Sequence, residues 1–239
     1  MLRAYLFLSV FTPITLLFAA SALFWTLVDA TGRLYAAHAR CWARLSLALA
    51  GATVTVRGTE SLPDGPVIFM SNHQSNFDIL ALLAHMPRQL HWIAKKELFD
   101  IPVFGPSMRR GGYIPLDRSD GRKALKSMES AAAVIRSGKS VVMFPEGTRS
   151  RDLCLLPFKR GGFLLALKAG VPVVPVTING SGKVNPAGRT RIYRGEITIT
   201  LHEPIRPSVG GARGAAEALL MEQVHRAISS VLEYQCTQA

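Results

Sequence analysis

The stretch VIFMSNHQSNFDILALLAH, residues 67–85, decides the fold, because it places a strand, a polar loop and a helix in succession. The four apolar residues Val67–Met70 predict a buried β-strand. Ser75 and Asn76 favour a helix N-cap, and the apolar residues after them predict a helix over Phe77–His85. A strand followed at once by a helix is the repeating unit of α/β proteins. The polar loop between them is therefore expected at the carboxyl end of a strand, where such folds place functional groups.

The same alternation of strands and helices continues along the chain from about Gly51. We therefore expect an α/β fold, with a mostly parallel sheet flanked by helices, over residues 51–239. Strands are expected at Val67–Met70, His91–Ala94, Gly112–Leu116, Val141–Phe144, Val171–Ile178 and Ile197–Leu201, and helices at Phe77–His85, Arg122–Ser137, Phe163–Ala169 and Ala215–Leu232.

Residues 1–50 form a different, hydrophobic segment. No charged residue occurs between Arg3 and Asp29. A helix over Ala4–Val28 would be about 37 Å long, enough to cross a bilayer core of about 30 Å. Arginines are more frequent after this run than before it, so the positive-inside rule predicts that the main domain lies at the cytoplasmic face of the membrane. The residues leave open whether the helix spans the bilayer or dips in and returns.

A second helix is expected between Gly32 and Gly51, with two distinct faces. Such an amphipathic helix could lie on anionic lipids with its arginines among the headgroups, or pack on the domain, and the two arrangements are compatible. The apolar face carries Leu34, His38, Trp42, Leu45 and Leu49, and the other face carries Arg33, Arg40 and Arg44.

The composition points to an anionic partner. Only 18% of the 239 residues are charged, yet the formal net charge is +12 at pH 7. A basic excess of this size suggests nucleic acid, a membrane surface, an acidic substrate or an acidic carrier protein. Because the first 50 residues are strongly apolar, we favour membrane lipids and expect no nucleic acid.

His73 and Asp78 are candidates for a catalytic pair. Positions i and i+5 do not share a helix face, so these side chains can meet only if the helix begins between them. Asp78 would then lie in the first turn and accept a hydrogen bond from His73, which leaves the other ring nitrogen as a free base. Because the chain has no G-x-S-x-G motif, the substrate would bring the nucleophile, most simply a hydroxyl. Taken alone, the spacing would also fit a capping role.

A second polar turn follows the apolar run of VVMFPEGTRSR, residues 141–151. Glu146 could accept a hydrogen bond from a substrate hydroxyl, and Gly147 would let the backbone approach a ligand closely. Thr148 offers a hydroxyl, and Arg149 offers a planar set of donors that suits a phosphate.

Two further strand ends carry cations, Lys95 and Arg118. Each alone would be an ordinary solvated charge. In a parallel sheet, however, the carboxyl ends of the strands open on one edge. Together with the His–Asp pair, these groups predict a base beside a site for an anion.

NHQSNFD (72–78), GGYIPLDR (111–118), FPEGTRS (144–150) and VPVVPV (171–176) form four blocks, which together resemble those that mark the 1-acyl-sn-glycerol-3-phosphate acyltransferases. NHQSNFD (72–78) resembles the first block, a His and an Asp separated by four residues. GGYIPLDR (111–118) resembles the second block, FPEGTRS (144–150) the third and VPVVPV (171–176) the fourth. The blocks occur in the family's order, and the resemblance covers about Gly51–Pro204.

The resemblance implies a glycerolipid acyltransferase fold with a catalytic domain over residues 51–239 and a membrane-associated N-terminus. The implied reaction transfers an acyl group from acyl-CoA or acyl-ACP to the sn-2 hydroxyl of lysophosphatidic acid, giving phosphatidic acid for phospholipid biosynthesis. It implies no metal and no cofactor beyond the thioester co-substrate. In the implied site His73 is the base and Asp78 orients it, Lys95, Arg118 and Arg149 hold the glycerol phosphate, and Glu146, Gly147 and Thr148 shape the pocket.

Three alternatives stay open. An enzyme of the same family could act on another acceptor, such as a lyso-ornithine lipid or glycerol 3-phosphate. NGSGK (179–183) suggests ATP binding, although Thr177 and Val184 break the P-loop pattern. The net charge alone would also fit a non-enzymatic binder of membranes or nucleic acid.

Overall fold

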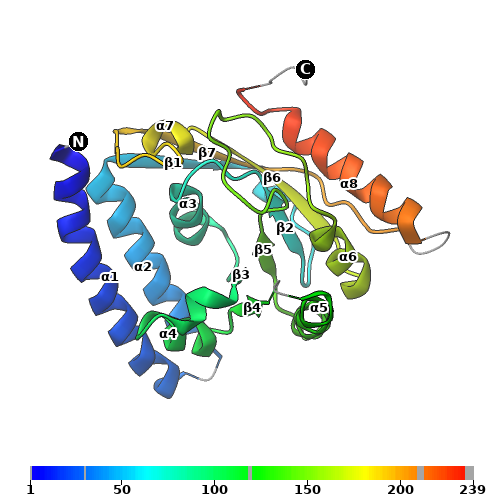
Figure 1. Ribbon diagram of the computed structural model, residues 1–239, viewed down its shortest axis with the longest axis horizontal. Helices are drawn as coiled ribbons and strands as arrows, with labels where there is room; N and C mark the ends of the chain where they lie inside the picture. Colours follow the sequence, from blue (N-terminus) through cyan, green and yellow to red (C-terminus); the bar gives the residue numbers. More distant parts are fainter. Residues whose placement is uncertain (1, 30, 118–119, 209–212, 235–239) are drawn as a thin grey trace.

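One seven-stranded sheet runs through the protein, in the order β1-β7-β6-β2-β5-β3-β4 (Figure 1). The computed structural model describes every residue except 1, 30, 118–119, 209–212 and 235–239. Neighbouring strands are parallel except for β6 and β7, which are antiparallel, so the predicted mostly parallel sheet is confirmed. The strands are β1 (Ala52–Arg57), β2 (Ile68–Ser71), β3 (His91–Lys95), β4 (Ile114–Leu116), β5 (Val141–Met143), β6 (Val173–Asn179) and β7 (Gly195–Leu201).

Helices cover both faces of this sheet. In Figure 1, α1, α2 and α3 lie on one side of the sheet, and α5, α6 and α8 lie on the other. The helices are α1 (Leu2–Val28), α2 (Arg33–Ala50), α3 (Phe77–His85), α4 (Phe104–Arg110), α5 (Gly121–Arg136), α6 (Arg160–Ala169), α7 (Ser181–Val184) and α8 (Arg213–Ser229), with 3₁₀ turns η1 (Thr59–Ser61) and η2 (Lys96–Asp100).

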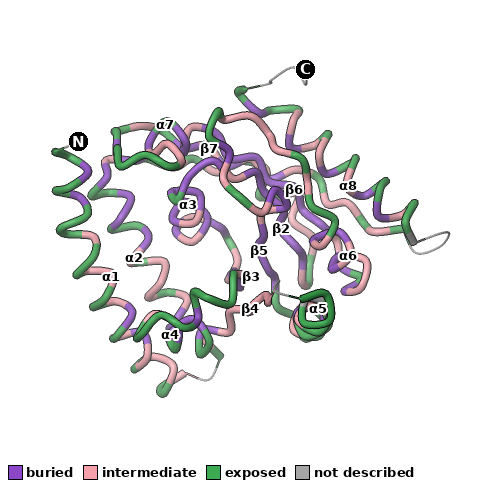
Figure 2. Tube along the Cα trace, in the orientation of Figure 1, coloured by how far each residue is buried: buried purple, intermediate pink, exposed green. Residues whose placement is uncertain are grey.

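Alternate side chains of each central strand enter two hydrophobic cores, one on each face of the sheet. In β2, Phe69 packs in the core shared with α2 and α3, whereas Ile68 and Met70 pack in the core shared with α6 and α8. All three are fully buried. Because both faces are covered, the strand has no polar side, and its sequence is a continuous apolar run. Figure 2 shows this buried layer through the middle of the molecule.

The helices α1 and α2 form an antiparallel hairpin at one side of the fold. Trp42 Nε1 donates a hydrogen bond to Thr15 Oγ1 at 3.0 Å, and Ser21 Oγ lies 2.9 Å from His38 Nε2. These pairs join the middle parts of the two helices.

The outer surface of α1 is apolar. The helix is long and apolar enough to cross a membrane by length and composition. It also contacts the rest of the fold, since the ring of Phe7 lies 5.9 Å from the ring of Phe77 in α3, and α1 packs on α4 as well. One hydrophobic core contains residues from both sides of residue 50. The division into segments 1–50 and 51–239 therefore stays a prediction. Apolar side chains exposed on α1 include Leu2, Tyr5, Leu6, Leu16, Leu17, Phe24, Leu27 and Val28.

Two arginines of α2 contact the neighbouring helix α3. Arg40 Nη2 donates to the carbonyl of Met86 at 3.0 Å, and Arg44 Nε donates to the carbonyl of Ala84 at 3.3 Å. Both carbonyls belong to the last turn and C-cap of α3, where cations pair with the helix dipole. The packing of this helix on the domain, one of the two compatible arrangements, is therefore present. Arg33 and Arg44 are also exposed, and the contact of the helix with anionic lipids stays a prediction.

Two elements were missed in the sequence, β1 and α4. β1 lies at the sheet edge and alternates buried and exposed side chains, so it lacks the long apolar run used to find the central strands. α4 has only seven residues, with Pro106 among them. The stretch NGSGK (179–183) forms the end of β6 and the start of the short helix α7, where a turn was expected.

Asn72 continues the pairing of β2 with β6 beyond the end of β2. Its side-chain amide donates to the carbonyl of Ile178 at 2.8 Å, and its carbonyl oxygen accepts from the amide of Ile178 at 2.7 Å. Asn72 is buried, so no water replaces these bonds. We expect Asn72→Ala to lower the free energy of unfolding by about 2–4 kcal/mol, because two buried backbone groups lose their partners.

Chemical denaturation followed by circular dichroism measures this change. The control is Glu129→Ala, which removes one partner of the exposed Lys168–Glu129 ion pair at 3.1 Å and should cost less than about 1 kcal/mol. If the two variants lowered the free energy of unfolding equally, the hydrogen bonds of Asn72 to Ile178 would not stabilise the fold as proposed.

Candidate active site

Two loops at the same edge of the sheet carry most of the predicted site residues. One loop follows β2 and carries His73, and the other follows β5, the parallel neighbour of β2, and carries residues 144–150. The loops are tied directly, because the amide of Ser150 donates to the carbonyl of His73 at 2.8 Å. The sheet therefore brings the first and third sequence blocks together, as the parallel topology predicts.

The expected hydrogen bond between His73 and Asp78 is present. His73 Nδ1 lies 2.7 Å from Asp78 Oδ2, and the Asp78 side chain is 0% exposed. The same oxygen accepts from the backbone amides of Gln74 and Ser75, each at 2.8 Å. Three donors thus converge on Oδ2, which compensates for part of the cost of burying the carboxylate and fixes the loop around it, whereas Oδ1 has no partner among the described residues.

The imidazole of His73 is held in one orientation. Because a carboxylate only accepts hydrogen bonds, Nδ1 carries the proton and Nε2 is left as the basic nitrogen. The ring stacks on Phe144 with the centroids 3.8 Å apart and the planes 8° apart. The His73 side chain is 13% exposed, and within the described part of the chain Nε2 has no hydrogen-bond partner. This geometry suits a general base that waits for a substrate hydroxyl.

One of the two residues expected to cap the start of α3 does so. Ser75 Oγ accepts from the amide of Phe77 at 3.1 Å, so Ser75 provides the side-chain cap. Asn76 makes no capping hydrogen bond, and its side-chain oxygen accepts from Arg149 Nη1 at 2.8 Å. Arg149 is therefore held beside the first turn of α3, next to the loop of His73.

Glu146 links loops in this structure. Its side chain is only 2% exposed, Oε1 accepts from the amide of His73 at 2.6 Å, and Oε2 accepts from the amide of Leu156 at 2.9 Å. Burial raises the pKa of the Glu146 carboxyl from 4.5 to about 7, although the two amide hydrogen bonds act in the opposite direction. Glu146 thus holds the backbone of His73, and its role in shaping a substrate pocket stays a prediction.

The other predicted residues are less closely grouped. Gly147 has φ 70°, and a Cβ there would lie 3.0 Å from Lys159, a cation that the sequence did not single out. Thr148 is exposed beside it. Lys95 is exposed at the end of β3, separated from β2 by β5. Arg118 lies outside the described residues.

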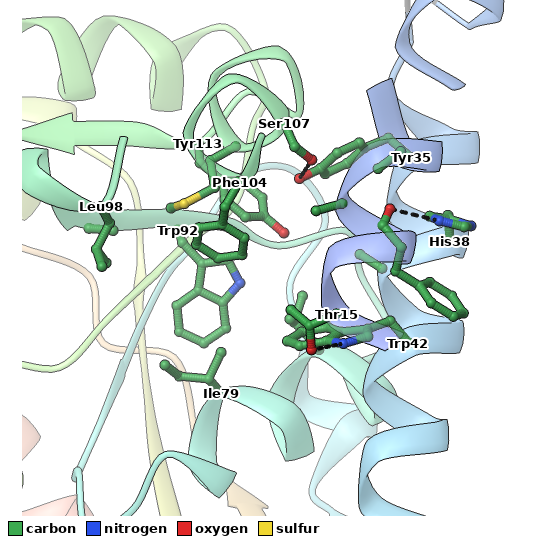
Figure 3. Close-up of a pocket in the computed structure, with 17 residues that line it drawn as sticks. Thr15, Tyr35, His38, Trp42, Ile79, Trp92, Leu98, Phe104, Ser107 and Tyr113 are labelled. Atoms are coloured by element: carbon green, nitrogen blue, oxygen red, sulfur yellow. Dashed lines mark hydrogen bonds between the residues drawn. The ribbon is translucent and has the colours of Figure 1, made fainter. Parts of the chain in front are cut away.

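Apolar cavities flank this site. A cavity of about 150 Å³ lies between the helical hairpin and the domain, with Trp92, Tyr113 and Phe104 facing Tyr35 and Trp42 across it (Figure 3). A second cavity of about 240 Å³, on the other face of the sheet, is lined by residues that include Met143, Phe144 and Lys159. Neither cavity could be found from the sequence, because each forms between elements that are distant along the chain.

The family model for acyltransferases matches residues 53–179. A chloroplastic 1-acyl-sn-glycerol-3-phosphate acyltransferase of Brassica napus is 41% identical over 170 residues, which cover 70% of this chain and 49% of the relative. The enzyme of that name from Salmonella typhimurium is 34% identical over 184 residues, which cover 72% of this chain and 73% of the relative. This chain spans about half the length of the matched plant and algal relatives.

The crystal structure of the 1-acyl-sn-glycerophosphate (LPA) acyltransferase PlsC from Thermotoga maritima superimposes with a TM-score of 0.79 at 25% sequence identity. The match covers 98% of this chain and 99% of that one, so it includes the N-terminal hairpin as well as the sheet. The chain belongs to the 1-acyl-sn-glycerol-3-phosphate acyltransferase family, as the four blocks indicated.

The raised pKa of Glu146 predicts a pH-dependent stability. Because the pKa is about 7 in the folded state and near 4.5 in the unfolded state, the folded protein binds more protons between these values, and stability falls as pH rises. We expect the wild-type free energy of unfolding to fall relative to that of Glu146→Gln by roughly 3 kcal/mol between pH 4.5 and pH 8.

Urea denaturation of both proteins in detergent across this pH range measures the difference. Glu129→Gln, an exposed carboxylate of α5, is the control and should show no such trend. If the free energies of unfolding of wild type and Glu146→Gln differed by the same amount at all pH values, the pKa of Glu146 would not be raised in the folded protein.

Proposed function

We propose that this protein transfers an acyl group from an acyl thioester to the free sn-2 hydroxyl of lysophosphatidic acid, giving phosphatidic acid. The observation that carries the proposal is the 2.7 Å bond from His73 Nδ1 to the buried Asp78, which leaves Nε2 as a base at the edge of the sheet. Arg149, held at the same loop, supplies a cation for the phosphate. The names of the relatives support this acceptor.

The proposed reaction begins at Nε2 of His73, which takes the proton of the acceptor hydroxyl as its oxygen attacks the thioester carbonyl. The imidazolium that forms is stabilised by the Asp78 carboxylate across the existing hydrogen bond. The tetrahedral intermediate collapses with cleavage of the C–S bond, and His73 returns its proton to the departing thiolate. An ester and a free thiol result, and no residue of the protein is acylated.

The donor in this proposal is acyl-CoA or acyl-ACP, and no metal or resident cofactor takes part. The acyl chain would find apolar space beside the base, because Phe144 stacks on His73 and lines the 240 Å³ cavity. The net charge of +12 suits a phosphate-bearing acceptor, a polyphosphate or acidic-protein donor and an anionic membrane surface.

We further propose that the hairpin of α1 and α2 attaches the protein to the cytoplasmic face of the cell membrane. The exposed apolar side chains of α1 would enter the lipid, while its contacts with α2, α3 and α4 keep the helix against the domain. A helix held in this way would lie in one leaflet, and the acceptor could reach His73 without leaving the membrane.

The nucleotide-binding alternative loses support in this structure. Lys183, the residue that would contact phosphates in a P-loop, forms an ion pair with Glu233 at 2.7 Å. Nothing in the geometry favours a different lysolipid over lysophosphatidic acid.

We expect His73→Ala to lower the turnover number for acyl transfer by at least about 100-fold, because the reaction loses its general base. The measurement is thiol release from acyl-CoA in detergent micelles that contain lysophosphatidic acid. His225→Ala, a histidine of α8 outside the site, should keep wild-type turnover. Undiminished activity of His73→Ala in a folded protein would refute the mechanism.

Arg149→Ala should raise the KM for lysophosphatidic acid by about 10- to 100-fold, the effect of losing one charge-assisted hydrogen bond. The KM for the thioester should change far less. Arg226→Ala removes a cation of the exposed Arg226–Glu222 pair of α8 and serves as the control. Equal changes in the KM of acceptor and donor would show that Arg149 does not select the phosphate.

A further inference from the structure

We propose that Arg189 and Arg191, on the loop of residues 185–192 between α7 and β7, bind the phosphate monoester of the acceptor together with Arg149. This inference rests on the proposed function and assigns the acceptor to a particular cavity. None of the four sequence blocks includes these two arginines, and the stretch NPAGRTRIYR (185–194) had suggested no function.

A cavity of about 480 Å³ joins the three arginines. It lies between the start of α1, the start of α3 and the 185–192 loop, so it is next to the loop of His73. Its volume falls within the range of about 300–1,000 Å³ that is usual for small-molecule sites. The lining residues include Phe7, Leu8 and Phe11 of α1 on one wall, and Arg149, Arg189 and Arg191 on the other.

The two walls of this cavity differ in chemistry, and the difference selects the ligand. The α1 wall is apolar and belongs to the helix whose outer surface is also apolar. The opposite wall carries guanidinium groups, which bind phosphate oxygens with paired hydrogen bonds. A single-chain lipid with a phosphate headgroup matches both walls, whereas the nucleotide part of coenzyme A would match only the cationic one.

Arg189 and Arg191 are available to a ligand. Both are exposed, and across the described ranges neither guanidinium forms a hydrogen bond or an ion pair with a protein group. Two arginines close together without a carboxylate partner repel each other, so an anion between them is favoured. Arg151 adds to this field, since its Nε lies 3.8 Å from where a Cβ on Gly188 would be.

The loop that carries them is fixed relative to the catalytic loop. Asn185 Nδ2 donates to the carbonyl of Arg191 at 2.9 Å, which closes the loop on itself. The carbonyl of Asn185 accepts from Ser75 Oγ at 2.8 Å, and Ser75 also donates its amide to Asp78. A phosphate held by this loop would therefore stay at a constant position relative to His73, which is what acyl transfer to one hydroxyl requires.

The test compares Arg189→Ala/Arg191→Ala with wild type in steady-state assays. Each protein is assayed with lysophosphatidic acid and with a phosphate-free monoacylglycerol as acceptor, and with acyl-CoA and an acyl-pantetheine thioester as donor. Arg206→Ala/Arg226→Ala removes two exposed cations elsewhere on the surface and is the matched control.

We expect the double variant to raise the KM for lysophosphatidic acid by about 10-fold or more, with the turnover number and the KM of both donors within about threefold of wild type. The KM and the turnover number with monoacylglycerol as acceptor should not change. A rise in the KM for acyl-CoA alone would assign these arginines to the donor phosphates, and no change beyond the control would make them ordinary surface charges. Either outcome overturns the inference.

Direct binding of lysophosphatidic acid in neutral detergent micelles, followed by tryptophan fluorescence, separates this inference from the proposed function. Weaker binding by the double variant than by its control supports the phosphate site even if wild-type turnover is absent. If the wild-type protein is active and the double variant binds lysophosphatidic acid as tightly as its control, the proposed function is kept and the phosphate site at Arg189 and Arg191 is refuted.

Discussion

The buried carboxylate of Asp78 is the interaction on which the rest of the site depends. Its Oδ2 accepts from the His73 ring and from the amides of Gln74 and Ser75. This one oxygen fixes the backbone of the loop before α3 and keeps the proton of the His73 ring on Nδ1. Removing this carboxylate would leave two buried amides without an acceptor, so the base and the backbone that holds it cannot be altered separately.

A second buried carboxylate, Glu146, connects this loop to its neighbours. Its carboxylate accepts hydrogen bonds from the amide of His73 and from the amide of Leu156. The backbone of His73 is therefore held by the loop after β5, while Asp78 of α3 holds its ring. Burial raises the pKa of Glu146 to about 7. The ionised carboxylate therefore lowers the free energy of unfolding at high pH.

The parts of the site that could be predicted from the sequence are those set by local chemistry. The contact of His73 with Asp78 follows from where a helix can begin, and the central strands and α3 follow from apolar runs and cap residues. Contacts between distant segments could not be predicted in this way. The pairing of Arg40 and Arg44 with α3, the backbone bonds of Glu146 and the place of Arg189 all depend on which elements become neighbours in space.

The antiparallel pairing of β6 with β7 determines how the hairpin of α1 and α2 meets the site. Because β7 runs opposite to β6, β7 begins at the edge where β2 and β6 end. β1 is parallel to β7, with Ala52 opposite Gly195, so β1 begins at the same edge. The end of α2 and the loop that carries Arg191 are thereby placed side by side, next to the loop of His73. The proposed membrane attachment and the proposed headgroup site are thus positioned by the edge strand β1 and its neighbour β7.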